Sequence, residues 1–384
     1  MYTLKKKYPD GLELGTFFER YSAIFSTKKT IVYIKNEFDD STFRYRFFNI
    51  KEAFDADEGN IELTCFLTSE IPSILNNLDE IDLIVLQRAT WDPLIDTLLY
   101  VAKIKAVPVY YDIDDCIYKP QYAADYIYAV GVEDAPTQNH LILYGAKIDI
   151  LLNQVEKCIV SNKILGKKIQ EDFGIPYFLV KNGFNQEQKE ASEYAISQKT
   201  IKDRKKFTIG YFSGSPSHNN DFRLAEVYLI RLMQKYENIY LNIVGYISLS
   251  EEWDKSGVKH KVKFEPKVSY QELQYKIAEV DVNIVPLLQT EFNDCKSELK
   301  FFEAALVNVV TCASPSFAYK NAISHGENGF LCSGEEWFTT IENIYLKNID
   351  ISSIIKNAYT TAFSNYDYKC IRSEYLKLLE VSAV

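Results

Sequence analysis

The sequence has few of the residues from which metal sites and disulfide frameworks are built. Its 384 residues include only four histidines and seven cysteines. The histidines form no HExxH or HxH cluster, and the cysteines lie singly, without CxxC or another ligand spacing. We therefore expect no protein-bound metal ion and no other cofactor. An odd number of isolated cysteines fits a protein of the reducing cytoplasm.

Long apolar runs and an excess of positive charge are also absent from the sequence. No apolar run reaches the roughly 20 residues that a membrane-spanning helix requires, and the basic start MYTLKKKYPD lacks the apolar core of a signal peptide. The formal net charge of -10 argues against nucleic acid as a partner, because such binding depends on basic residues that neutralise phosphates. Hydrophobic residues at 47% predict a globular protein with sizeable cores.

Short apolar runs alternate with amphipathic stretches along most of the chain, which is typical of parallel sheets with crossover helices. Strands are predicted at 30–35, 81–87, 107–112, 157–162 and 177–182, and again at 207–212, 240–246, 261–265, 280–287, 308–313 and 329–332. The polar, lysine-rich stretch 185–206 interrupts the alternation. We predict an α/β fold of two Rossmann-like, doubly wound parallel-sheet domains, 1–205 and 206–365, that face each other across a cleft. A final helix, 366–384, is expected to pack back on the first domain.

Candidate ligand-binding residues follow from the sheet prediction, because open parallel sheets bind ligands beyond the carboxyl ends of their strands. In the first domain these ends carry Arg88, the motif DIDD at 112–115, Asn162 and Asn182. In the second domain they carry the loop SGSPSHNND at 213–221 and Gly245. The two sets are expected to line the cleft.

The loop 213–221 joins a strand to a helix and has the composition of a phosphate-binding turn. Gly214 lets the backbone approach a ligand, and the free N–H groups at the helix start suit an anion. The loop matches neither GxGxxG nor GxxxxGK[ST], so neither a dinucleotide-binding fold nor a P-loop nucleoside triphosphatase is indicated. The alternative is a turn without a ligand.

Two lysines stand where a helix should begin, in the stretch CKSELKFFEAALVNVV at 295–310. Ser297 is a suitable N-cap for this helix, yet Lys296 and Lys300 place positive charge where the helix dipole disfavours it. With Glu303 they have the spacing of one helical face. A diphosphate bound by the lysines would explain them, and Glu303, ~9–10 Å along, would reach an attached ribose. The alternative is a solvated Lys/Glu face.

These stretches together resemble a known family. Residues 207–337 resemble the donor-binding domain of retaining glycosyltransferases of the GT-B fold, family 4 of the sequence-based classification, in IGYFSGSPSHNNDF, YLNIVG, VDVNIVPL, KSELKFFEAALVNVVTCASP and ISHGENGFL. In the first half, IDLIVLQR, VYYDIDD and CIVSN…FLVKNG resemble the acceptor-side domain. The resemblance covers nearly the whole chain.

The resemblance implies a nucleoside-diphosphate sugar donor and metal-independent transfer. The donor would bind to Ser213, Gly214, Ser215, His218, Gly245, Lys296, Ser297, Lys300 and Glu303. In this set Glu303 binds the ribose, the lysines bind the diphosphate, and the loop 213–218 lies under the phosphates. Family members commonly have a second, sugar-contacting glutamate eight positions before the ribose-binding one, and here Cys295 stands there, beside Asp294.

The DIDD motif supplies the candidate catalytic residues. We expect Asp114 or Asp115 to bind acceptor hydroxyls or to orient Arg88. Asp-x-Asp is also the metal motif of the other large glycosyltransferase fold, but no partner ligands accompany it here. A retaining transferase can use the leaving phosphate itself as base, so direct chemistry by these carboxylates is not required. A plain acidic cap is the structural alternative.

We therefore predict a cytoplasmic glycosyltransferase that moves a hexose to a glycan or lipid-linked glycan in bacterial polysaccharide or cell-envelope assembly. Lys163, Lys167 and Lys168, together with the basic N-terminus, are expected to touch anionic lipid at the inner face of the membrane. Two alternatives stay open at this point. One is a catalytically silent GT-B partner that binds donor or glycan, which the Cys295 departure leaves open, and the other is a sugar-nucleotide epimerase.

Overall fold

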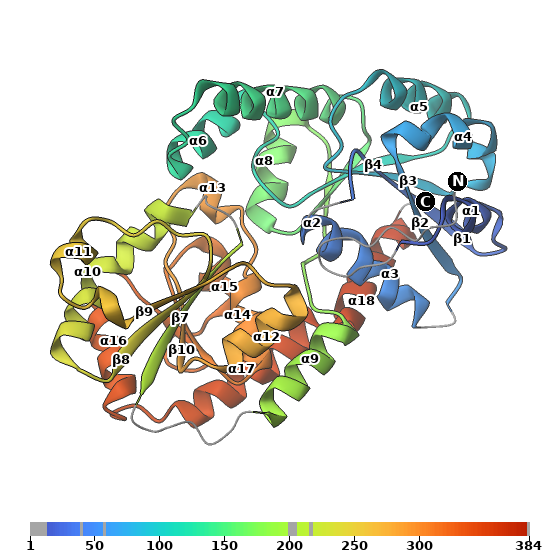
Figure 1. The fold of residues 1–384 in the computed structure, drawn as a ribbon. Coiled ribbons are helices and arrows are strands. Elements are labelled where there is room, and N and C mark those ends of the chain that lie inside the picture. Colours follow the sequence, from blue (N-terminus) through green and yellow to red (C-terminus); the bar gives the residue numbers. More distant parts are fainter. Residues whose placement is uncertain (1–13, 39–40, 57–58, 199–205, 215–217, 382–384) are drawn as a thin grey trace.

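A computed structural model describes residues 14–38, 41–56, 59–198, 206–214 and 218–381. These residues form two six-stranded parallel sheets, each flanked by helices (Figure 1). The first sheet has the order β2-β1-β3-β4-β5-β6, and the second has the order β12-β11-β10-β7-β8-β9. In each sheet the chain begins at an interior strand, adds strands toward one edge and then adds strands toward the other edge, as in a doubly wound fold. The direction changes between β1 and β3 in the first sheet and between β7 and β10 in the second. The predicted fold class is confirmed.

The strands of the first sheet are β1 (Lys29–Lys35), β2 (Ile61–Leu67), β3 (Leu83–Gln87), β4 (Val109–Ile113), β5 (Lys157–Val160) and β6 (Tyr177–Leu179). Those of the second are β7 (Phe207–Ser213), β8 (Ile239–Gly245), β9 (Val262–Glu265), β10 (Val282–Val285), β11 (Val310–Ala313) and β12 (Phe330–Leu331). Each predicted strand overlaps one of these. The sequence patterns missed β2, whose polar Glu62 and Thr64 interrupt its apolar run.

The helices of the first half are α1 (Phe17–Ser22), α2 (Ser41–Phe43), α3 (Asn49–Asp55), α4 (Ile71–Ile74), α5 (Pro93–Ile104), α6 (Pro120–Val130), α7 (Ala135–Leu152), α8 (Lys163–Phe173) and α9 (Gln186–Ser197). The second half contributes α10 (Asn219–Lys235), α11 (Glu252–Lys255), α12 (Tyr270–Ala278), α13 (Glu291–Asp294), α14 (Leu299–Leu306), α15 (Phe317–Ala322), α16 (Glu336–Tyr345), α17 (Ile351–Tyr366) and α18 (Tyr368–Val381). Among the helices described, none is both long and apolar enough to cross a membrane.

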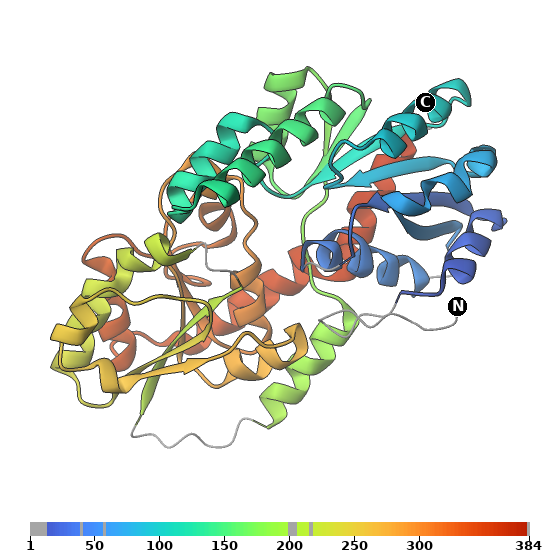
Figure 2. The same cartoon turned by 45° about the horizontal axis from the view of Figure 1, so that its top comes forward.

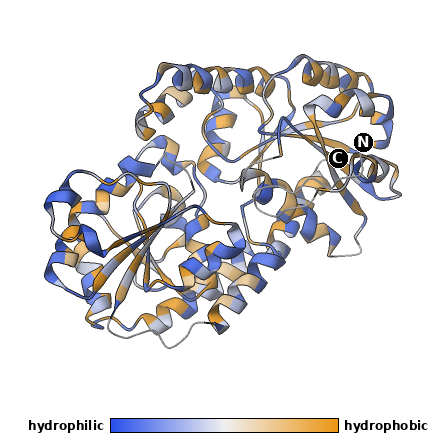
Figure 3. Ribbon diagram, in the orientation of Figure 1, coloured by the Kyte–Doolittle hydropathy of each residue, from blue (hydrophilic) through white to orange (hydrophobic). Residues whose placement is uncertain are grey.

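The sheets are buried on both faces, which explains why their strands read as apolar runs. Residues Ile31 to Ile34 of β1 and Ile284 of β10 have no exposed surface. Figure 3 shows many hydrophobic residues along the strands of both sheets. Parallel strands covered by helices gain most of their stability from such burial, at roughly 25 cal/mol per Å² of apolar surface.

Helix α9 and the C-terminal helix α18 each pack on the domain opposite to the one that their place in the sequence suggests. Helix α9 lies in the polar stretch between the two patterns but packs on the second domain, where Ser192 donates a hydrogen bond to Gln274 of α12 (3.0 Å). The chain returns at its end, since α18 packs on the first domain (Figure 2). There Tyr375 accepts a hydrogen bond from Tyr33 of β1 (2.9 Å).

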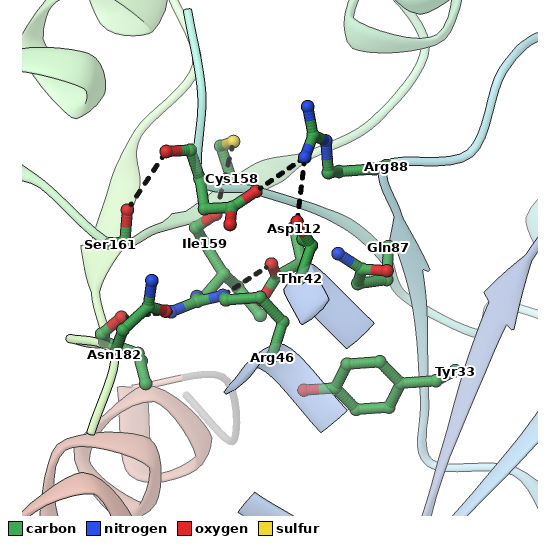
Figure 4. Close-up of polar contacts among 12 residues, drawn as sticks. Tyr33, Thr42, Arg46, Gln87, Arg88, Asp112, Cys158, Ile159, Ser161 and Asn182 are labelled. Carbon is green, nitrogen blue, oxygen red and sulfur yellow. Dashed lines mark hydrogen bonds and ion pairs between the residues drawn. The ribbon is translucent and has the colours of Figure 1, made fainter. Parts of the chain in front are cut away.

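A fully buried ion pair ties the carboxyl edge of the first sheet together. Arg46, in the π-helical turn Arg44–Phe48, donates two hydrogen bonds to Asp112 at the end of β4 (2.8 and 2.9 Å). It also donates to the carbonyl of Val180 and to the side chain of Asn182 beyond β6. Figure 4 shows this arginine between the strand ends. Such a pair is costly to break, because the remaining charge would be buried without compensation.

Replacing Arg46 with Met is therefore expected to lower the free energy of unfolding by about 3–5 kcal/mol. The control Lys51→Met removes a partly exposed cation of the following helix α3, where Lys51 pairs with Asp55 of the same helix at 3.0 Å. It should change the free energy of unfolding by less than about 0.5 kcal/mol. Urea unfolding measures both. Burial already raises the pKa of Asp112 despite the opposing Arg46 charge. The folded variant therefore binds more protons than the unfolded chain. The loss in its free energy of unfolding, relative to the wild type, should thus become smaller as the pH falls. An equal loss in both variants would contradict this role of Arg46.

Candidate active site

A cavity of 340 Å³ lies between the two domains and is lined by residues of both. The first domain contributes Thr42, Arg44, Tyr45, Asp114, Asp115 and Asn182, and the second contributes the polar residues Ser213, Gly214, His218, Lys267, Tyr270, Lys296, Ser297, Lys300, Glu303 and Tyr319. The apolar part of the wall consists of Phe212, Val244, Val268, Leu273, Val285, Leu287 and Leu299. The structure thus brings most of the predicted catalytic and donor-binding residues to one cavity.

Gly245, Arg88 and Asn162 are not part of the described cavity wall, although the sequence placed them at strand ends beside it. Ser215 lies outside the described residues. Gly245 ends β8 behind the neighbouring Val244, with a φ of 102°. A Cβ atom there would lie 1.8 Å from the carbonyl oxygen of Ser213, so glycine is needed for the close approach of β8 to β7. Arg88 lies behind the acidic residues of the wall and pairs with them.

The predicted N-cap of the lysine-bearing helix is wrong. Helix α14 begins at Leu299, with Glu298 at the cap position and no side-chain cap. Ser297 instead accepts a hydrogen bond from Asn182 of the first domain (3.0 Å). Lys296 therefore precedes the helix, on the connection from α13, and does not share a helical face with Lys300 and Glu303. All three still reach the cavity wall, because this connection turns toward the first domain.

The two lysines bring uncompensated positive charge into the cavity. Neither forms an ion pair with a described residue, and their ammonium groups lie over the rings of Phe292 (4.7 Å) and Tyr211 (5.1 Å). Burial lowers the pKa of Lys296. Burial and the charge of Lys296 lower the pKa of Lys300 to about 8. A bound anion would reverse both penalties, so the site favours a doubly charged ligand.

His218 at the start of α10 is held as a neutral side chain. Burial and the charges of Lys296 and Lys300 lower its pKa to about 3, and its Nδ1 lies 2.9 Å from Asp221. Burial would raise the pKa of Asp221, but the hydrogen bond with His218 and the charge of Lys296 outweigh it, so this pKa is lowered. An ionised carboxylate only accepts, so Nδ1 carries the proton and Nε2 is left as an acceptor. That nitrogen suits a sugar hydroxyl better than a phosphate oxygen.

The acidic residues of the DIDD motif divide into two roles. Asp112 is bound by Arg46 inside the domain, whereas Asp114 and Asp115 line the cavity and pair with Arg88 at 3.5 and 3.3 Å. Burial raises the pKa of Asp114 to about 6, with the Arg88 charge opposing and the Asp115 charge adding to the shift. Such a carboxyl group can accept or release a proton near neutral pH.

Arg88 is positioned for this pairing by an unusual backbone. Its φ of 44° is rare outside glycine, and its side chain donates a hydrogen bond to Thr42 (2.9 Å) (Figure 4). Strained backbone of this kind concentrates at functional sites.

The described residues contain no group of three His, Cys, Asp or Glu side chains that could hold a metal ion. The Asp-x-Asp spacing does not provide one either, because both oxygens of Asp112 face Arg46.

Sequence reasoning missed the residues that the π-helical turn brings to the cavity. Tyr45 donates a hydrogen bond to Glu303 across the domain boundary (2.8 Å), and both side chains are buried. The guanidinium of Arg44 lies between the rings of Tyr45 (4.1 Å) and Tyr270 (4.2 Å). The stretch STFRYRFFN matches no motif, and its alternation of aromatic residues with arginines is the pattern of a strand and not of the turn that forms.

Comparison with known proteins gives a family match for the second domain and fold matches for nearly the whole chain. Residues 206–346 match the family model described as glycosyl transferases group 1. HepE of Anabaena, solved with UDP and glucose, has a TM-score of 0.60 and 14% identity, over 92% of this chain and 100% of that one. A glycosyltransferase of Rickettsia africae has a TM-score of 0.64 and 11% identity, over 92% and 98%. Sucrose-phosphate synthase of Thermosynechococcus elongatus has a TM-score of 0.62 and 13% identity, over 93% and 100%. No curated protein sequence matches the chain.

The pKa of Lys300 predicts how the binding of a nucleoside diphosphate depends on pH. Because Lys300 loses its charge near pH 8, the affinity for UDP should fall about tenfold from pH 7 to pH 9. The phosphates stay ionised over this range, since their second pKa is about 6. Lys300→Arg should flatten the profile, because arginine keeps its charge. Titration calorimetry at four pH values measures this, and equal affinities at pH 7 and 9 would contradict it.

The same lysine has the opposite effect on stability. Its folded-state pKa lies below the unfolded value, so the unfolded chain binds more protons between pH 8 and 10. The free energy of unfolding without ligand should therefore rise with pH over that interval, and less so in Lys300→Arg.

Proposed function

We infer that this chain is a glycosyltransferase of the GT-B fold. We propose that it transfers a hexose from a UDP-hexose donor to a glycan or lipid-linked glycan acceptor. The observation that carries the proposal is the pair Lys296 and Lys300, which face an interdomain cavity without a counter-ion among the described residues. A donor diphosphate supplies the missing negative charge. Assignment to family 4, with retention at the anomeric carbon, is part of the proposal.

The remaining donor contacts follow from the groups around the lysines. Glu303 has one carboxylate oxygen bound by Tyr45, which leaves the other for the ribose hydroxyls. The apolar wall at Val244, Val268 and Leu273 can cover a nucleobase. Uracil is proposed as the base because HepE and other solved structures with this fold were determined with UDP.

The sugar-contacting role of the missing glutamate is proposed for His218. Cys295, which stands at the glutamate position, is fully buried, and Asp294 accepts a hydrogen bond from the backbone N–H of Phe317 (2.8 Å). Neither residue belongs to the described cavity wall. The neutral imidazole of His218 can accept, at Nε2, a hydrogen bond from a hydroxyl of the donor sugar.

On the acceptor side, Asp114 is proposed to bind the attacking hydroxyl. Its pKa of about 6 lets it take a hydrogen bond from that hydroxyl in the ionised form, and Arg88 keeps it oriented. The leaving phosphate, held by the lysines, takes the proton in a retaining transfer. In this mechanism Arg88 and Asp115 position Asp114 and do not touch the sugar.

The cellular role is proposed from the same chemistry. A cytoplasmic enzyme of polysaccharide or cell-envelope assembly that uses a lipid-linked acceptor would work at the inner face of the membrane. Lys163 and Lys167 are exposed and can contact anionic lipid there. Lys168, which the sequence analysis included, is engaged by Glu291 (2.7 Å) and is removed from this set. The basic N-terminal stretch lies outside the described residues.

Replacing both Lys296 and Lys300 with Gln is expected to weaken UDP binding at least ~100-fold, because each charge-assisted bond to phosphate contributes ~1.5–3 kcal/mol. Stability should be unchanged or slightly higher, since two half-buried cations are removed. Lys255→Gln with Lys259→Gln, on exposed ion pairs of the same domain, is the matched control. Calorimetry with UDP and thermal unfolding measure both effects. Wild-type UDP affinity in the Lys296/Lys300 variant would overturn the donor site.

Glu303→Gln should raise the KM for the donor about tenfold, because an amide accepts the ribose hydroxyls more weakly than a carboxylate. Release of UDP from UDP-glucose or UDP-GlcNAc, with and without glycan acceptors, measures turnover. A catalytically silent partner would bind UDP without releasing it from a donor, and an epimerase would isomerise the sugar.

Activity is also expected to survive excess EDTA. The described site offers no set of three metal ligands, and the lysines supply the positive charge that a metal would otherwise bring to the diphosphate. Loss of UDP release on chelation, with recovery on adding Mn²⁺ or Mg²⁺, would contradict the metal-independent mechanism.

A further inference from the structure

The segment Glu291–Ser297 belongs to the second domain by sequence but is packed against the first. It comprises α13 and the connection to α14, and it carries Lys296. Its side-chain contacts with the first domain include the ion pair Lys168–Glu291 (2.7 Å) and the ring contact Tyr126–Phe292 (4.9 Å). Phe292 and Cys295 belong to the hydrophobic core of the first domain. The donor-binding lysine is therefore carried by a segment that both domains hold.

Asn162, after β5, binds the main chain of this segment directly. Its Nδ2 donates hydrogen bonds to the carbonyl oxygens of Asp294 (3.0 Å) and Lys296 (2.9 Å). Its Oδ1 accepts from the backbone N–H of Ile164 (2.7 Å) and so caps α8. Only 5% of Asn162 is exposed, and its side chain uses all of these bonds at once.

A second asparagine holds the other side of Lys296. Asn182 donates to Ser297 (3.0 Å) and accepts from Arg46 (3.1 Å). The segment is thus held on both sides of the lysine, through its main chain by Asn162 and through the Ser297 side chain by Asn182. Asn182 is itself bound by the buried Arg46.

Contacts within the second domain leave this part of the segment less constrained. The backbone N–H of Lys296 donates to the carbonyl of Asn293 (3.2 Å). For the Lys296 carbonyl, the partner in the described structure is Asn162. The direction of the lysine side chain therefore depends on a contact across the domain boundary.

We propose that Asn162 is a positioning residue for donor binding: it fixes the main chain of Lys296 from the opposite domain, so that the ammonium group faces the donor diphosphate. The proposal rests on the proposed function, in which Lys296 binds that diphosphate. It makes donor affinity depend on contact between the domains. Because such coupling is reciprocal, a bound donor strengthens the contact between Asn162 and the segment by the same factor.

Asn162→Ser separates the two roles of the side chain. Serine is as good an N-cap as asparagine, so α8 keeps its cap, but the two hydrogen bonds to the segment are lost. UDP affinity should fall about tenfold, as expected from losing one to two hydrogen bonds that orient a ligand-binding group. Asp92→Ser makes the same cap replacement on α5, where Asp92 accepts from Leu94 (2.8 Å), and should leave UDP affinity unchanged. Both variants should unfold at similar temperatures.

A double-mutant cycle with Lys296→Gln tests whether Asn162 acts through the lysine. If it does, Asn162→Ser will weaken UDP binding about tenfold in the wild type and not at all in the Lys296→Gln background. Equal effects in both backgrounds, or wild-type affinity in Asn162→Ser, would overturn the proposal. If Lys296→Gln itself binds UDP normally, the proposed donor site fails instead. Should Asn162→Ser not fold, Asn162→Asp, which also keeps the cap and loses both donations, takes its place in the cycle.

Discussion

The buried ion pair between Arg46 and Asp112 organises the face of the first domain that meets the cavity. Arg46 reaches the ends of β4 and β6 from a π-helical turn, and this fixes the turn against the sheet. The same turn presents Arg44 and Tyr45 to the second domain. Through Asn182, the arginine also reaches the segment that carries Lys296. One buried charge pair thus supports contacts with the second domain at both Glu303 and Ser297.

The second constraint on the site is the positive charge of Lys296 and Lys300, which have no ion-pair partner among the described residues. Lys296 and Lys300 lie together in a partly buried cavity, where burial lowers both pKa values. His218 stays neutral beside them for the same reason. An isolated fold gains nothing from such an arrangement, since separating or exposing the lysines would lower its free energy. Under the proposed function, a dianionic donor removes this conflict, and the unfavourable electrostatics of the free protein become affinity for that donor.

The sequence identified most of the polar residues of the cavity wall, in part because parallel sheets bind ligands at their strand ends. Asp114 and Gly214 were found by that rule, Lys300 was found from its charge at the expected start of a helix, and the resemblance to a family added roles. Tyr45 and Arg44 were not found, because a π-helical turn has no sequence period that would mark it. The cap at Ser297 was misassigned for a different reason. Its hydroxyl accepts a hydrogen bond from Asn182, more than a hundred residues earlier in the chain. Helix-capping rules consider only residues that are close in sequence, so they could not predict this contact.

The sequence by itself determined the alternation of strands and helices, the two-domain division and the electrostatic conflict near Lys296. These are local properties, set by the spacing of apolar residues and by charges a few positions apart. Only the tertiary structure decided which domain holds the segment Glu291–Ser297, which carboxylates of DIDD face the cavity, and which partners Glu303 and Asp112 have. These depend on hydrogen bonds between residues far apart in the chain. Such bonds depend on the assembled tertiary structure, and no local pattern encodes them.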